Sequence, residues 1–180
     1  MIIKQKEGQM ERNWSQVRAE VKNFVEKEVY PAESILEKRG DKSKEKMSEL
    51  MQLAKDKNLW ALGHPKDIGG QGMPFMEYVY VNEVVGRSSP SMVALGTHSL
   101  QDSIMLREFA SKTWRDAYLE PLVAGEIFPS FAMTEPEISS SDPTQLQTTA
   151  VLEGDEWVIR GRKWFTTGAA SAAYTTVMCK

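Results

Sequence analysis

Apolar residues recur at helical spacing from the start of the chain. Trp14, Val17 and Val21 lie three or four residues apart, which places them on one face of a helix. This spacing predicts a first helix over residues 10–29. Pro31 is expected to end the helix, because proline has no backbone N–H to donate and its ring clashes with the preceding turn.

Four further helices are predicted between residues 41 and 125, from apolar stripes bounded by capping residues, prolines and glycines. Their expected starts are, in order, Asp41 or Ser43 as alternative caps, Pro74, Ser89 with Pro90, and Ser111. The helix after Pro74 is expected to continue through Phe75, Tyr78, Val79, Asn82 and Val85 to Gly86. The next one is expected to run through Gly96 to Ile104, and a glycine at that point indicates close packing. Residues 59–73 are predicted to form a loop.

Beyond Gly125 the pattern changes from helical to alternating, as Phe131 and Met133 alternate with small residues. Further strands are expected at residues 146–152, 156–159, 163–167 and 174–178, the first two of these forming a hairpin. The chain therefore predicts an α+β fold. An all-α N-terminal helical domain over residues 1–126 is followed by an incomplete antiparallel β domain over residues 127–180.

Composition narrows the classes of partner. The 22 basic and 25 acidic residues leave a net charge of −3, which gives no basis for binding nucleic acid. Apolar runs are too short to span a membrane, and residues 1–12 lack the features of a signal peptide. Cys179 is the single cysteine, which fits a reducing compartment, so we expect a cytoplasmic protein. His64 has no partner at metal-ligand spacing, and no metal site is predicted.

Two segments carry the candidate chemistry. Residues 131–136 read FAMTEP and lead into a serine-rich turn, and residues 161–168 read GRKWFTTG. Each segment combines apolar or aromatic side chains with hydroxyl groups. Hydroxyls and backbone N–H groups on a rigid strand can grip the polar edge of a flat ring while one face of the ring stays free. The two segments together predict the wall of a site for a flat heteroaromatic cofactor.

These segments, with LEPLVAGE at 119–126 and GDEWVI at 154–159, resemble the acyl-CoA dehydrogenases from about residue 10 to residue 180. The resemblance implies a flavoprotein oxidoreductase of fatty acid metabolism with FAD as cofactor. Such an enzyme removes a proton from the α carbon of an acyl-CoA substrate and passes the β hydride to flavin N5. The resemblance also implies an electron-transfer flavoprotein as partner and a homo-oligomer. A C-terminal helical bundle completes the family's site.

The same resemblance assigns roles to individual residues. The implied contacts to FAD are Phe131, Met133, Thr134, Phe165 and Thr167. Within this set, the Thr134 hydroxyl would bond the edge of the ring, Phe165 would pack against the flavin and Thr167 would place a hydroxyl near N5. Ser140 and Ser141 are implied to contact substrate. Their turn is one residue longer than is usual, which resembles the branch of the family that acts on unusual, long or hydroxylated acyl chains.

The aromatic residue that faces the flavin is expected to follow from strand alternation. Neighbouring side chains of a strand point to opposite faces, so Phe165 and Thr167 would face the cofactor while Trp164 and Thr166 face away. An ordinary core position for Phe165 stays open as an alternative.

No catalytic residue is predicted. The family's base is a carboxylate of the C-terminal bundle that no residue here matches, and Glu135 is implied to be structural. We therefore expect the N-terminal part of an FAD-dependent acyl-CoA dehydrogenase, inactive as an isolated chain. Two alternatives stay open: a truncated, non-catalytic helical interaction module, and an acyl-CoA oxidase of the same fold. Neither the acyl-chain length nor the electron acceptor is predicted.

Overall fold

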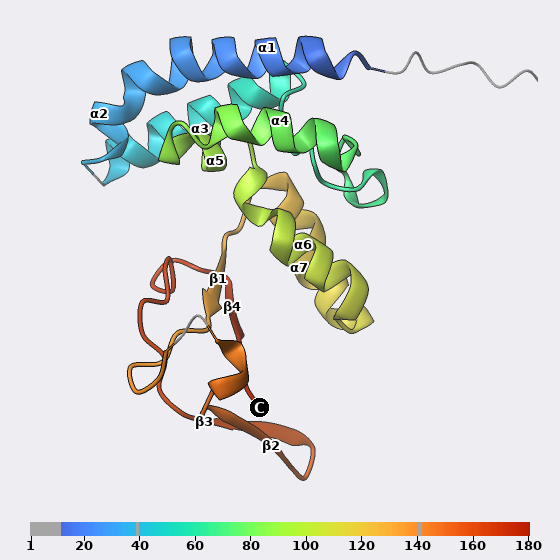
Figure 1. The fold of residues 1–180 in the computed structure, drawn as a ribbon, viewed down its shortest axis with the longest axis vertical. Helices are drawn as coiled ribbons and strands as arrows, with labels where there is room; N and C mark the ends of the chain where they lie inside the picture. The colour runs from blue at the N-terminus through green and yellow to red at the C-terminus, as the bar shows by residue number, and fades with distance from the viewer. Residues whose placement is uncertain (1–11, 39, 140–141) are drawn as a thin grey trace, which may run out of the picture. The chain divides into compact units, whose positions relative to one another are not determined.

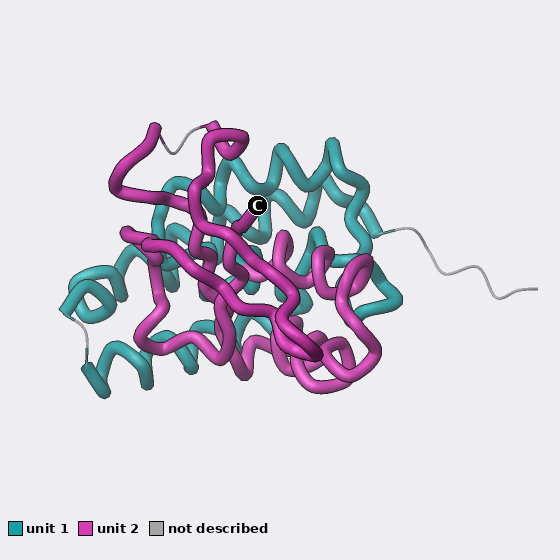
Figure 2. Tube along the Cα trace, turned by 90° about the horizontal axis from the view of Figure 1, so that it is seen from below, with its two compact units in different colours: residues 1–98 teal, residues 99–180 magenta. Residues whose placement is uncertain are grey.

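The computed structural model describes residues 12–38, 40–139 and 142–180. Helices occupy most of the chain up to residue 124, and short strands follow (Figure 1). The chain divides into two compact units, residues 1–98 and residues 99–180 (Figure 2). The change from a helical to a β domain at residue 126 stays a prediction.

The first unit begins with α1 (Trp14–Phe24), which the side chain of Asn13 caps by accepting a hydrogen bond from the Gln16 N–H at 3.4 Å. Val17, Val21 and Phe24 are buried, as the helical spacing predicts. The chain then continues through a π-helix (Val25–Val29), a 3₁₀ turn (Tyr30–Ala32) and α2 (Glu33–Leu36).

Pro31 does not end the helical course, which corrects the prediction. The Tyr30 N–H donates to the carbonyl of Val25, five residues back. This wider π turn shifts the hydrogen-bond register immediately before the proline, so the chain stays helical without a donor at Pro31.

Helix α3 (Asp41–Asp56) buries Leu50, Met51 and Ala54, which share one face at helical spacing. Neither of the two predicted caps acts as one. Gly40 occupies the cap position without a side-chain bond, and the Ser43 hydroxyl instead donates to the Leu36 carbonyl at 3.0 Å. The region after α3 forms turns around a short 3₁₀ helix (Lys66–Ile68), in agreement with the predicted loop.

Helix α4 (Phe75–Val85) forms where it is predicted. Its buried residues are Tyr78, Val81, Val84 and Val85. Phe75, the first residue of the helix, is 76% exposed. Apolar residues occur nearly all round this helix, so the pattern could not select one buried face.

The helix predicted from Ser89 to Ile104 is broken into α5 (Ser89–Ala94), a 3₁₀ turn (Thr97–Ser99) and α6 (Leu100–Phe109). Gly96 causes the break, because its φ of +69° is left-handed. A Cβ atom at this position would lie 2.7 Å from the Trp60 ring. The close packing expected of this glycine is therefore confirmed, whereas the continuous helix is wrong.

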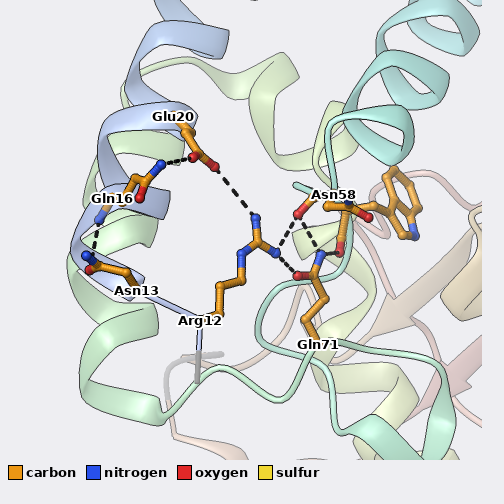
Figure 3. Close-up of polar contacts among 7 residues, drawn as sticks. Arg12, Asn13, Gln16, Glu20, Asn58 and Gln71 are labelled. Carbon is orange, nitrogen blue, oxygen red and sulfur yellow. Dashed lines mark hydrogen bonds and ion pairs between the residues drawn. The ribbon is translucent and has the colours of Figure 1, made fainter. Parts of the chain in front are cut away.

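A polar cluster ties the start of α1 to the loop after α3 (Figure 3). The Arg12 guanidinium donates to the Asn58 carbonyl at 2.7 Å and to the side-chain oxygen of Gln71, and it lies 3.7 Å from Glu20. The Gln71 amide in turn donates to the Trp60 carbonyl at 2.7 Å. Two segments far apart in the sequence are thereby joined beside the buried Trp60.

The second unit contains α6 and α7 (Lys112–Ala124) followed by the strands. Ser111 caps α7 as predicted, its hydroxyl accepting from the Trp114 N–H at 3.4 Å. Gly125 ends the helix with a left-handed φ of +76°. Among the described residues, no helix is both long and apolar enough to cross a membrane.

In the part of the second unit that the structure describes, four strands form two pairs. β2 (Thr149–Glu153) and β3 (Glu156–Arg160) make the predicted antiparallel hairpin around Gly154. β1 (Pro129–Ala132) and β4 (Tyr174–Val177) pair in parallel, with Phe131 opposite Thr176, so the predicted antiparallel arrangement holds for the hairpin only. The α+β class is confirmed.

Candidate functional site

Glu135, three residues after the end of β1, is the centre of a polar cluster in the second unit. Its side chain is only 3% exposed. One carboxylate oxygen accepts the Gln147 N–H at 2.7 Å, and the other accepts the Thr148 N–H at 2.9 Å. Lys163 completes the set with an ion pair of 2.8 Å. These bonds satisfy a buried carboxylate and support the structural role expected for Glu135.

Lys163 links the two candidate cofactor segments. Its side chain is 10% exposed, and its ammonium also donates to the Met133 carbonyl at 2.9 Å. The next residue adds a backbone bond, from the Trp164 N–H to the Thr134 carbonyl at 3.0 Å. Two consecutive carbonyls of one segment are therefore held by two consecutive residues of the other.

A third tie shows that the two segments run side by side in opposite directions. The Ser130 hydroxyl donates to the Thr167 carbonyl at 2.8 Å. Thr134 is bonded to Trp164. Four residues before Thr134, Ser130 is bonded to Thr167, which comes three residues after Trp164. The structure accordingly brings the backbones of residues 130–134 and 163–167 together.

The segment from Lys163 to Thr167 is not a strand, which corrects the prediction. Phe165 has a left-handed φ of +50°, rare for a residue with a side chain. The Trp164 and Phe165 rings contact each other with centroids 4.7 Å apart, whereas neighbours in a strand point to opposite faces. The expected alternation therefore fails, and Trp164 and Phe165 together form one aromatic pair.

Exposure differs among the predicted cofactor contacts. Phe165 is 78% exposed and Trp164 44% exposed, so the core alternative for Phe165 is wrong. Thr167 is also exposed, and its hydroxyl lies 3.5 Å from the Phe165 carbonyl. Phe131, Met133 and Thr134 are half-buried.

Ser140 and Ser141, the predicted substrate contacts, lie outside the described residues, so their role stays a prediction. Two residues that contribute to the site were not assigned a role from the sequence. Lys163 and Ser130 act on partners 28 and 37 positions away, respectively. A lysine in a polar loop and a serine in a short strand carry no local signal of such contacts.

The electrostatics of the cluster follow from its bonds. Hydrogen bonding, first of all from Lys163, lowers the pKa of Glu135 from 4.5 to about 2. The carboxylate therefore stays ionised at neutral pH and suits an anchor rather than a general base, which needs a pKa near the working pH. Among the described residues, no group of three or more His, Cys, Asp or Glu side chains could hold a metal ion.

Comparison with known proteins identifies the family. The model of the acyl-CoA dehydrogenase N-terminal domain matches residues 13–126, and that of the middle domain matches residues 130–180. The chain belongs to the acyl-CoA dehydrogenase family. FAD is the characteristic cofactor of this family.

Individual acyl-CoA dehydrogenases agree with this result. The probable acyl-CoA dehydrogenase FadE2 of Mycobacterium tuberculosis is 35% identical over 69% of the chain and 30% of its own length. Acyl-CoA dehydrogenase family member 11 of Gallus gallus is 29% identical over 89% of the chain and 22% of its own length. The crystal structure of the acyl-CoA dehydrogenase of Geobacillus kaustophilus matches 96% of the chain and 44% of its own length, with a TM-score of 0.69 and a sequence identity of 27%. The chain thus spans less than half the length of these acyl-CoA dehydrogenases.

Proposed function

We propose that this chain supplies part of the flavin-binding wall of an FAD-dependent acyl-CoA dehydrogenase. The observation that carries the proposal is the joining of residues 130–134 to residues 163–167 by the Lys163 and Ser130 bonds. An aromatic pair stands exposed on this joined backbone. Family membership supports FAD as the ring-shaped group that such a surface would hold.

The residues present fit such a cofactor. The exposed Phe165 ring, with Trp164 against it, offers an apolar surface for a flat heteroaromatic ring. Thr134 and Thr167 add hydroxyl groups on the two joined segments, suited to the polar edge of the same ring. Phe131 and Met133 are proposed to line the same side.

When bound at these residues, FAD would supply a hydride acceptor for the α,β-dehydrogenation of an acyl-CoA thioester. The residues of this chain bind and orient the ring and shield one side of it from water. The electron-transfer flavoprotein is proposed as the partner that takes the electrons, and the acyl-CoA thioester as the substrate of the complete enzyme.

Titration of the purified chain with FAD tests the proposal. We expect saturable binding at one site per chain, read out as a change in flavin fluorescence and absorption. Phe165→Ala should weaken binding, because it removes the exposed ring. Phe75→Ala is the matched control, since Phe75 is equally exposed but lies on α4 in the other unit. Absence of binding, or equal weakening by both variants, would contradict the proposal.

A further inference from the structure

Lys163 is an unusual lysine because its charged end is taken out of water. Its side chain is 10% exposed, and its ammonium makes two short contacts, to the Glu135 carboxylate at 2.8 Å and to the Met133 carbonyl at 2.9 Å. Burial of an ammonium group is costly unless it is paired and hydrogen-bonded. This placement therefore commits the side chain to one geometry.

The same residue sits immediately before the exposed aromatic pair. Its side chain grips the Met133 carbonyl while the Trp164 N–H binds the next carbonyl, that of Thr134. The distance between the Thr134 backbone and the aromatic pair is therefore fixed from both the side chain and the main chain of residues 163–164. A shift of the ammonium would move both surfaces that are proposed to hold the flavin.

Phe165 needs such a restraint on both sides. Its left-handed φ of +50° is unfavourable for a residue with a Cβ atom and persists only where the surroundings enforce it. Lys163 and Trp164 hold the chain just before it, and the bond from Ser130 to the Thr167 carbonyl holds the chain just after it. The exposed position of the Phe165 ring therefore depends on hydrogen bonds made by the neighbouring residues Lys163 and Trp164 and by Ser130.

We infer that Lys163 is a positioning residue for FAD, acting through Glu135 and Met133 without touching the cofactor. The inference rests on the proposed function. On this inference, the ion pair between Lys163 and Glu135 contributes to the affinity for FAD as well as to the stability of the fold.

Three variants separate these contributions. Lys163→Met combined with Glu135→Gln removes the ion pair without leaving one charge buried alone. Lys163→Arg keeps the positive charge and its bonding to Glu135 and should recover most of the affinity. Arg162→Met combined with Glu137→Gln is the matched control, because it also removes one positive and one negative charge, from an exposed ion pair at the adjacent residue.

FAD titration of each folded variant gives both the stoichiometry and the dissociation constant. We expect the dissociation constant of the double variant at Lys163 and Glu135 to rise about tenfold or more, by analogy with the loss of affinity when the outer hydrogen-bond partners of metal ligands are removed, and that of the control to stay unchanged. Amide hydrogen exchange at Trp164, measured without FAD, should be faster in the double variant at Lys163 and Glu135 only, because the Trp164 N–H is bonded to Thr134.

The outcomes are distinct. A merely structural role would lower the stoichiometry, because fewer molecules fold, and leave the dissociation constant of the folded fraction unchanged, and this result overturns the inference. Equal weakening when the exposed Arg162–Glu137 pair is removed also overturns it, since the loss of any ion pair in this segment would then explain the result. If the unaltered chain does not bind FAD, the proposed function fails first and the inference fails with it.

Discussion

Phe165 carries two unfavourable features at one position, a left-handed backbone and a ring that is 78% exposed. Strained residues of this kind cluster at functional sites, where another requirement outweighs their cost. Glycine would adopt the same backbone freely and would not expose an aromatic ring. The position is therefore one where stability and cofactor binding should favour different residues.

Phe165→Gly is expected to leave the thermal midpoint of unfolding unchanged or to raise it slightly, while FAD affinity falls. Relief of the left-handed conformation favours the folded state, although the added freedom of glycine in the unfolded chain offsets part of this gain. Differential scanning fluorimetry and flavin titration of the same preparation measure the two quantities. A large loss of stability would show that the ring serves packing rather than binding.

At the scale of elements, several local signals predicted correctly, although the proposed caps of α3 and the stop at Pro31 did not, and contacts between distant residues were not predicted. The cap at Ser111, the end of α7 at Gly125 and the hairpin around Gly154 depend on neighbours within a few residues. The residue types at 163–167 favour a strand, which is why the sequence predicts one there. The true path of this segment depends on Glu135, 28 residues away, which no short pattern reveals.

At the candidate site, too, short motifs predicted more than the long-range contacts could. The motifs identified the two segments that the structure joins, whereas their contacts to a cofactor stay a prediction. Strand alternation predicts that Trp164 and Phe165 point to opposite faces. The left-handed backbone of Phe165 instead brings the two rings together on one side. The prediction that Trp164 faces away from Phe165 is therefore wrong.

Gly96 gives a prediction for the helix break between α5 and the following turn. Gly96→Ala should lower the free energy of unfolding by more than about 1 kcal/mol, because it combines a left-handed backbone with a clash against the Trp60 ring. Gly86→Ala is the control, as its φ of −67° is helical and its nearest neighbour would lie at 3.4 Å. Urea unfolding followed by circular dichroism compares the two, and equal losses would contradict the packing argument.

At the scale of the whole molecule, the two units contain buried groups that titrate in different pH ranges. In the first unit, burial lowers the pKa of His64 from 6.5 to about 4, with His98 acting in the same direction. In the second unit, the pKa of Glu135 is lowered from 4.5 to about 2. Burial raises the pKa of Asp102 in the second unit, which opposes acid destabilisation there.

Acid should therefore weaken the first unit before the second. The unfolded chain binds a proton at His64 more readily than the folded chain, so this contribution is complete above pH 6.5 and is lost as the pH falls toward 4. The Glu135 contribution is complete above pH 4.5 and is lost as the pH falls toward 2. Residue-resolved hydrogen exchange across this range measures both, and His64→Gln should reduce the first loss only. Simultaneous loss in both units would contradict the assignment.

The bond between Glu135 and Lys163 encloses the β2–β3 hairpin, which lies wholly within the 28 positions separating its two ends. A hairpin that forms early, on a microsecond timescale, draws these ends together and reduces the entropy lost when they meet. The order of events in refolding follows from this nesting: the hairpin comes first, and the aromatic surface acquires its final form only once the outer contact closes. Slowing the hairpin by altering its turn at Gly154 should delay maturation of a surface in which that turn takes no part.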